Sequence, residues 1–185
     1  MTKAVFFDRD GTLIRHVHYL ADPAEVALLP DSACSLRRLR EKGYRAIVVT
    51  NQSALGRGLF TEADYRTVNE AMCRQLAAEN AVIDAIYASP DVPQEGGRFS
   101  VEYRNRKPGP GMLEQAAADY GLDIAQCWMV GDMISDVLAG HNAGCKGSVL
   151  ASTGNEGIPK ELAELRPPVP VARTLTEAVD RILAE

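Results

Sequence analysis

Five polar side chains stand where short apolar runs end or where a predicted helix begins. They are Asp8, Asp10, Thr50, Lys107 and Asp132. If the apolar runs are strands of an open parallel sheet, residues after their carboxyl ends meet at one edge, where such sheets bind ligands. The sequence therefore predicts one site that gathers three carboxylates, a hydroxyl and an ammonium group.

Three clustered carboxylates without cysteine or histidine ligands suit a hard cation. Mg²⁺ prefers oxygen ligands, keeps several waters and completes its shell with phosphate oxygens. Without a cation, carboxylates this close together would raise one another's pKa. A lysine and a threonine hydroxyl beside the metal fit a phosphoryl group lying between them. These residue types therefore indicate magnesium-dependent phosphoryl chemistry.

Alternating strands and helices must bring these residues together. We predict strands over residues 3–7, 45–50, 85–88, 127–130 and 147–151. We predict helices that begin near Asp31, Thr61, Pro110, Ser135 and Thr174. Thr61 and Asp64 have the spacing of a capping box, Pro110 stands at a first helical position, and Gly144 is expected to end the helix that begins near Ser135. Strands that alternate with helices are typical of βαβ units, so we expect an α/β fold with a mostly parallel central sheet.

Composition and length limit the class of protein. The chain has 185 residues, 46% hydrophobic and 24% charged, which fits a single globular domain over residues 1–185. Its net charge of −5 disfavours nucleic acid as a partner. We see no secretory signal and no apolar run approaching the ~20 residues of a membrane span. The cysteines lack the spacing of a metal site or a disulfide pair. We expect a cytoplasmic protein without membrane contact, and a monomer by default.

Four segments of the sequence carry a resemblance to a known family. They are FDRDGT (7–12), VVTNQSALGRGLFTEADY (48–65), RKPGPGM (106–112) and MVGDMISD (129–136). Together they resemble the motifs of the haloacid dehalogenase (HAD) superfamily of phosphatases. Within it, they are similar to the branch of D-glycero-D-manno-heptose 1,7-bisphosphate 7-phosphatases and histidinol-phosphate phosphatases. The resemblance implies a HAD-like, Rossmann-like three-layer sandwich.

The family's mechanism, carried over to the matching positions, assigns a role to each motif. Asp8 would attack phosphorus as the nucleophile, and Asp10 would act as general acid and base. The Asp8 carboxylate, the Asp10 backbone carbonyl and Asp132 would hold Mg²⁺. Thr50 and Lys107 would bind the phosphoryl oxygens.

Two further motif residues would support this machinery. Gly11 would let the backbone turn so that both aspartates of its motif face one pocket. For Asp136 two interpretations stay open. It would orient the lysine or support the metal, or it is only a carboxylate at a helix N-terminus, where the helix dipole favours negative charge.

Substrate specificity must come from the loops at residues 16–19, 53–60 and 90–106, because the intervals between motifs leave no room for a large cap domain. The candidate substrate-binding residues are His16, Tyr19, Asn51, Gln52, Ser53, Arg57 and Arg106. Of these, Arg57 and Arg106 are the candidates for binding a second anionic group, since a guanidinium fork matches phosphate or carboxylate.

Two positions depart from the branch. Many members carry a zinc loop before the Arg-Lys-Pro motif, but this chain has Ser89, Asp91, Tyr103 and Asn105 at the matching positions. We therefore expect no structural zinc, and we expect Phe99, Val101 and Tyr103 to pack the loop instead. Met133 replaces a lysine that is usual in the heptose phosphatases, and the loss of this cation beside the pocket favours a less anionic substrate, such as one with a single phosphate.

The leading hypothesis is a magnesium-dependent phosphatase of a small phosphosugar, in first place D-glycero-D-manno-heptose 1,7-bisphosphate. Histidinol phosphate, another small metabolite or a DNA 3′-phosphate are alternative substrates for the same chemistry. A phospho-accepting switch domain is an alternative from a different class. Such domains place the acceptor aspartate after the third strand, whereas Asp8 follows the first.

Overall fold

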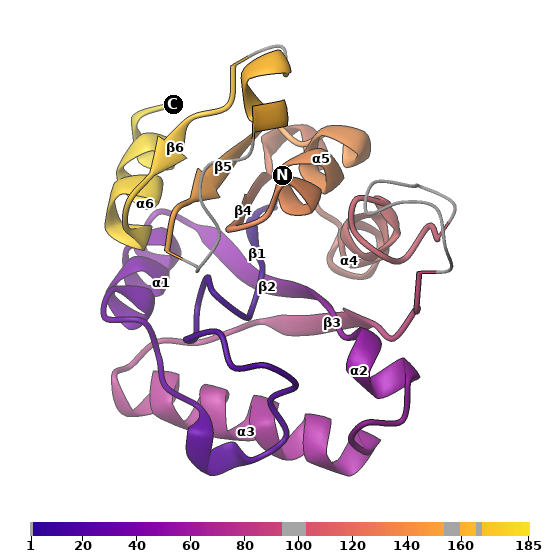
Figure 1. The fold of residues 1–185 in the computed structure, drawn as a ribbon. Coiled ribbons are helices and arrows are strands. Elements are labelled where there is room, and N and C mark those ends of the chain that lie inside the picture. Colours follow the sequence, from indigo (N-terminus) through magenta and orange to yellow (C-terminus); the bar gives the residue numbers. More distant parts are fainter. Residues whose placement is uncertain (1, 94–102, 154–159, 166–167) are drawn as a thin grey trace.

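A computed structural model describes residues 2–93, 103–153, 160–165 and 168–185 (Figure 1). The strands of this part of the chain form one sheet in the order β3-β2-β1-β4-β5-β6, with all neighbours parallel. They are β1 (Lys3–Phe7), β2 (Tyr44–Asn51), β3 (Ala85–Ser89), β4 (Trp128–Gly131), β5 (Gly147–Ala151) and β6 (Val171–Ala172). The α-helices are α1 (Ser32–Glu41), α2 (Ser53–Gly56), α3 (Glu62–Ala78), α4 (Gly111–Tyr120), α5 (Ile134–Ala143) and α6 (Leu175–Ala184). Short 3-10 helices are η1 (Pro23–Glu25), η2 (Ile124–Gln126) and η3 (Lys160–Glu164).

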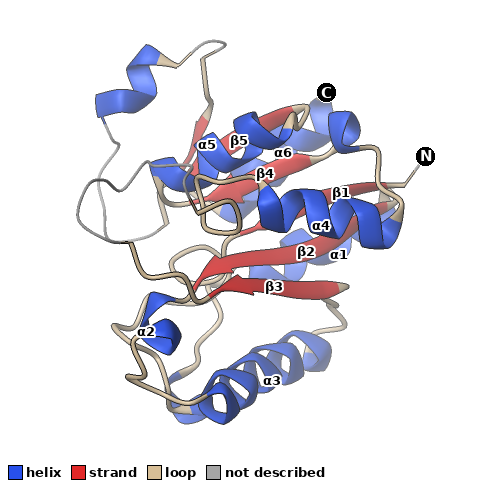
Figure 2. Ribbon diagram, turned by 90° about the vertical axis from the view of Figure 1, so that its right-hand side faces the viewer, coloured by secondary structure: helices blue, strands red, loops and turns tan. Residues whose placement is uncertain are grey.

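Helices cover both faces of the sheet, with α1 and α6 on one side and α4 and α5 on the other (Figures 1 and 2). The side chains of β1 alternate between two cores. Val5 and Phe7 pack in the same core as residues of α1, α3 and α6. Ala4 and Phe6 pack with residues of α4 and α5. A strand buried on both faces needs apolar residues at every position, which explains the uninterrupted apolar run. The expected three-layer α/β sandwich is confirmed.

Local signals in the sequence place the helix ends. Thr61 and Asp64 form the predicted capping box of α3, in which each side chain accepts a hydrogen bond from the other residue's backbone N–H. The Thr174 hydroxyl accepts from the backbone of Glu177 at the start of α6. Gly144, with a φ of 78°, ends α5 as expected. The sequence therefore predicts the frame of the molecule correctly.

Three local predictions differ from the structure. Pro110 is the residue before α4 rather than its first residue, because the helix begins at Gly111. The one-turn helix α2 lies in a segment expected to be a loop. Strand β6 was not predicted, because its two residues are too few to show a period in the sequence.

The sheet topology creates the crevice in which a ligand would bind. From β1 the chain goes on to β2 on one side, whereas β4, on the other side of β1, leads to β5. Ligands of doubly wound sheets bind at such a switch point, beyond the carboxyl ends of the strands. The described residues contain no separate cap domain over this crevice, since β1 and β2 are joined through η1 and α1 alone. No helix within the described ranges is both long and apolar enough to span a membrane.

Candidate active site

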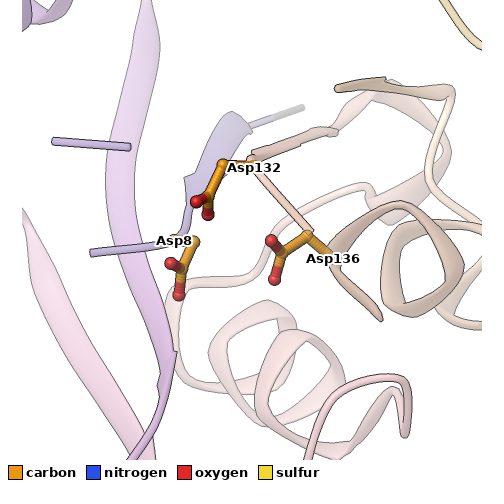
Figure 3. Close-up of side chains that lie close together, drawn as sticks. All are labelled: Asp8, Asp132 and Asp136. Carbon is orange, nitrogen blue, oxygen red and sulfur yellow. The ribbon is translucent and has the colours of Figure 1, made fainter. Parts of the chain in front are cut away.

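The three carboxylates of Asp8, Asp132 and Asp136 point toward one another at the switch point (Figure 3). One oxygen atom of each lies within 4.8 Å of the others, and all three residues are buried. The Asp8 backbone N–H donates to the Val130 carbonyl at 2.9 Å, which ties the residue after β1 to the end of β4. The cluster lies at a cavity of about 630 Å³. Small-molecule sites of 300–1,000 Å³ are usual in proteins.

Two glycines give the carboxylates their space. A Cβ atom at Gly11 would overlap the Asp132 carboxylate, and one at Gly131 would overlap the Asp136 carboxylate. Gly11 also has a φ of 85°, in the left-handed region that other residues avoid. The turn predicted after the first motif is present, and close approach of a carboxylate is a second reason for its glycine.

Lys107 lies between two of these carboxylates. Its Nζ atom is 2.5 Å from Asp8 Oδ1 and 2.6 Å from Asp136 Oδ1, and it donates to the Val49 carbonyl at 2.7 Å. The side chain of Asn51 holds the Lys107 backbone at both its N–H and its carbonyl, at 2.9 and 3.0 Å. The end of β2 therefore fixes the lysine that faces the end of β1.

Asp136 makes the contacts of both expected roles, at the helix start and with the lysine. Oδ2 accepts a hydrogen bond from the Met133 backbone N–H at 2.9 Å, which caps α5. Oδ1 pairs with Lys107. The carboxylate therefore stabilises the helix start and orients the lysine at the same time.

The cluster carries an excess of negative charge. Burial raises the pKa of Asp8 to about 7, Lys107 opposes the rise, and Asp136 and Asp10 add to it. Burial, with repulsion from Asp8 and Asp136, raises the pKa of Asp132 to about 8. Burial alone would lower the pKa of Lys107, but Asp136 and Asp8 raise it overall. One ammonium group does not neutralise three buried carboxylates, so an oxygen-preferring divalent cation fits this donor set.

Asp10 lines the same cavity, but its carboxylate faces other partners. Its Oδ2 accepts from Arg9 Nη2 at 2.9 Å, from Arg9 Nε at 3.1 Å and from Gln52 Nε2 at 2.9 Å. Its Oδ1 is buried and has no hydrogen-bond partner among the described residues. Gln52 also donates to Thr50 Oγ1 at 2.8 Å, which links the two motifs.

The cavity collects almost every residue that the sequence predicted for the site. Its walls include Asp8, Asp10, His16, Tyr19, Thr50, Asn51, Gln52, Ser53, Arg106, Lys107, Asp132 and Asp136. Arg57 is exposed and does not line the cavity. Burial lowers the pKa of Arg106, Asp91 opposes this effect, and repulsion from Arg57 adds to it.

Sequence reasoning assigned no role to several residues that line the cavity, among them Arg9, Leu20, Ile134, Ser135 and Glu161. Phe60 and Tyr103 line the cavity from two of the loops expected to give specificity, and Met133 lines it where the branch usually has a lysine. Arg9 had the clearest signal, because a charged residue between two motif aspartates after a buried strand needs a partner.

Hydrogen bonds hold the start of the loop where related proteins carry zinc ligands. The Ser89 hydroxyl donates to Asp91 Oδ2 at 2.9 Å, and Arg106 Nη1 donates to the Asp91 carbonyl at 3.0 Å. Phe99 and Val101 lie outside the described residues. The absence of a structural zinc stays a prediction from the residue types.

Comparison with known proteins places the chain in a family. A model of HAD-hydrolase-like proteins matches residues 104–178. The D-glycero-beta-D-manno-heptose-1,7-bisphosphate 7-phosphatase of Haemophilus ducreyi is 39% identical, over 82% of this chain and 84% of the relative. The D-glycero-alpha-D-manno-heptose-1,7-bisphosphate 7-phosphatase of Burkholderia mallei is 39% identical, over 77% of this chain and 76% of the relative.

Solved structures agree. The D,D-heptose 1,7-bisphosphate phosphatase from B. bronchiseptica, complexed with magnesium and phosphate, superposes with a TM-score of 0.81 at 31% identity, covering 100% of this chain and 99% of that one. A HAD-like phosphatase from Mesorhizobium loti gives the same score and identity over 98% of this chain and 84% of that one. The chain therefore belongs to the HAD-like hydrolases, in the family of the D-glycero-D-manno-heptose-1,7-bisphosphate 7-phosphatases.

Proposed function

We propose that this protein hydrolyses the 7-phosphate of D-glycero-D-manno-heptose 1,7-bisphosphate through an aspartyl-phosphate at Asp8, with Mg²⁺ as cofactor. The observation that carries the proposal is the buried cluster of Asp8, Asp132 and Asp136 with Lys107 in its midst, at the wall of a cavity of about 630 Å³. Identity to enzymes named for this reaction supports the substrate. The same family membership favours an enzyme over a phospho-accepting switch.

The reaction has two steps on this chain's own residues. In the first, a carboxylate oxygen of Asp8 forms a bond to phosphorus, and the bond from phosphorus to the sugar oxygen breaks. Asp10 gives that oxygen its proton. In the second, Asp10 takes a proton from water, whose oxygen attacks phosphorus and releases Asp8. Lys107 and Thr50 hold the phosphoryl oxygens as charge develops on them.

Mg²⁺ would bind the carboxylates of Asp8 and Asp132 and the backbone carbonyl of Asp10. When bound, it supplies positive charge to the phosphoryl oxygens. Asp136 is not among these ligands, since one of its oxygen atoms contacts Lys107 and the other caps the start of α5. The donor set of oxygen atoms fits magnesium better than a softer metal.

Mg²⁺ is expected to stabilise the fold in the absence of substrate, because it relieves repulsion among buried carboxylates. At a hundredfold excess over Kd, the free energy of unfolding should rise by about 2.7 kcal/mol, measured by thermal and urea denaturation with and without chelator. Asp132→Asn should lose most of this gain. Asp119→Asn, which changes an exposed carboxylate on α4, should keep it. Equal gains in both variants would contradict the assignment of the metal ligands.

The rest of the substrate would contact the cavity rim. Arg106 is the better of the two predicted guanidinium groups for a second anionic group, because it lines the cavity and Arg57 does not. His16, Tyr19 and Ser53 supply further polar groups to the wall. Met133 contributes no charge, so the rim binds a second phosphate with one cation fewer than the branch usually provides.

A kinetic comparison of four substrates tests the function. They are the two anomers of D-glycero-D-manno-heptose 1,7-bisphosphate, fructose 1,6-bisphosphate and histidinol phosphate. We expect kcat/KM for one heptose anomer to exceed that for the last two substrates by roughly tenfold or more, the range that a few specific contacts provide. Preference for histidinol phosphate would replace the proposed substrate but keep the reaction. No phosphate release from any of the four would overturn both.

We also propose that residues 1–185 act as one catalytic domain, as a cytoplasmic monomer without a nucleic-acid partner or a structural zinc. The four cysteines are free, as is usual in a reducing compartment. The net charge of −5 disfavours binding to a phosphate backbone.

A further inference from the structure

We infer that Arg9 is a positioning residue that holds the Asp10 carboxylate in place for the proton transfer of both steps of the reaction. The inference rests on the proposed function, in which Asp10 is the general acid and base. Arg9 does not itself contact the reacting atoms, and helix α3 holds it in place.

The hydrogen bonds of Asp10 distinguish its two oxygens. Three N–H groups, two from Arg9 and one from Gln52, donate to Oδ2 at 2.9–3.1 Å. Oδ1 is buried without a partner among the described residues, on a side chain that lines the cavity. Two of the three donors to Asp10 belong to Arg9, so the orientation of the carboxylate in the cavity depends mainly on this guanidinium group.

Arg9 is itself held from three directions. It is 1% exposed, the largest of the fully buried side chains, and Nη1 donates to Asn69 Oδ1 on α3 at 2.8 Å. Its guanidinium carbon lies 5.6 Å from the centre of the Tyr65 ring, also on α3. Its carbonyl accepts from the backbone of Leu13 and Ile14 at 3.0 and 3.1 Å, which fixes the turn after β1.

The residues of α3 that contact Arg9 lie outside the cavity. Neither Asn69 nor Tyr65 lines the cavity. Both act on the site only through Arg9, so a change at Asn69 leaves the phosphate and metal groups untouched. A purely structural Arg9 would neutralise Asp10 and stabilise the fold without affecting one chemical step more than another.

A pair of substrates that differ in their leaving groups separates the two roles. Benzyl phosphate expels an alkoxide, which needs a proton. p-Nitrophenyl phosphate expels a stable phenolate, which does not. For both, kcat/KM reports phosphoryl transfer to Asp8 and excludes the later hydrolysis step. Loss of a well-placed acid should therefore lower kcat/KM for benzyl phosphate and spare that for p-nitrophenyl phosphate.

The variants are compared in the full-length, Mg²⁺-loaded enzyme. Asp10→Asn sets the limit, with a loss of roughly 10²–10⁴-fold on benzyl phosphate. We expect Arg9→Met to lose roughly 10²-fold and Asn69→Ala roughly tenfold on that substrate, since small misplacements of a catalytic group cost this much. All three should stay within roughly threefold on p-nitrophenyl phosphate, and Arg9→Lys should recover part of the loss.

Gln75→Ala is the matched control. It also removes an amide side chain from α3, one that donates to the Val26 carbonyl at 2.8 Å rather than to Arg9. Both substrates should be affected equally, by less than about twofold. If Arg9→Met fails to fold, Asn69→Ala alone decides the question.

Each result has one meaning. If Asp10→Asn lowers kcat/KM equally for benzyl phosphate and p-nitrophenyl phosphate, the acid role in the proposed function is wrong. If Asp10→Asn shows the selective loss, while Arg9→Met and Asn69→Ala lower both substrates equally or neither, the inference about Arg9 is overturned and the proposed function stands.

Discussion

Asp8→Asn is expected to abolish turnover while the fold stays intact. An amide does not form the bond to phosphorus, so kcat should fall by roughly 10⁴-fold or more, the scale of nucleophile loss in other enzymes. The measurement is release of inorganic phosphate from the preferred sugar phosphate. Mass spectrometry of acid-quenched enzyme should detect a phosphorylated protein in the wild type and none in the variant.

The fold should tolerate this change because Asp8 is crowded by negative charge. Burial and the carboxylates of Asp136 and Asp10 raise the pKa of Asp8 and oppose its ionisation. Replacing it by a neutral side chain of the same shape relieves this repulsion, and Lys107 keeps Asp136 as a partner. The melting temperature without metal should therefore stay equal or rise. Asp180→Asn, which changes an exposed carboxylate of α6, is the matched control with unchanged kcat. Near-normal turnover in Asp8→Asn would disprove the mechanism.

Lys107→Met is expected to have the second largest effect, and its effects on rate and on metal affinity should have opposite signs. In the proposed mechanism the ammonium group stabilises the developing charge on the phosphoryl oxygens, so kcat/KM should fall by roughly 10²–10³-fold. The same positive charge repels a metal ion bound to Asp8. Its removal should therefore tighten Mg²⁺ binding, measured by calorimetry and by the Mg²⁺ concentration needed for half-maximal activity.

Stability gives a further readout for this variant. Lys107 is 2% exposed and contacts Asp8, Asp136 and the Val49 carbonyl, so its loss leaves buried acceptors without a donor. Breaking a buried pair from one side costs about 3 kcal/mol. Mg²⁺ should therefore raise the free energy of unfolding of Lys107→Met by more than it raises that of the wild type. Lys146→Met, which removes an exposed lysine near Trp128, is the control for the substitution itself. Weaker Mg²⁺ binding in Lys107→Met would contradict the proposed position of the metal.

The sequence was sufficient for those features that depend on residues close together in the chain. Apolar runs such as 3–7 and 147–151 are buried on both faces and have no alternative to a central strand. The capping box of Thr61 and Asp64 is formed within one turn of helix. Because every strand is parallel, the residues that follow them are carried to one edge. That topology brings Asp8 and Asp132 together whatever the loops do.

Only the tertiary structure decided which side chains around that edge share an atom or a partner. Two arginines were candidates in the sequence, with Arg106 ahead because of its place in a motif, and in the structure Arg106 lines the cavity whereas Arg57 does not. Asp136 pairs with Lys107, and Asp10 turns instead to Arg9, which in turn contacts Asn69 sixty positions away. The direction of a side chain is set by the packing of elements remote in sequence. A motif therefore fixes the position of a group along its strand, and the contacts across the fold decide what that group can do.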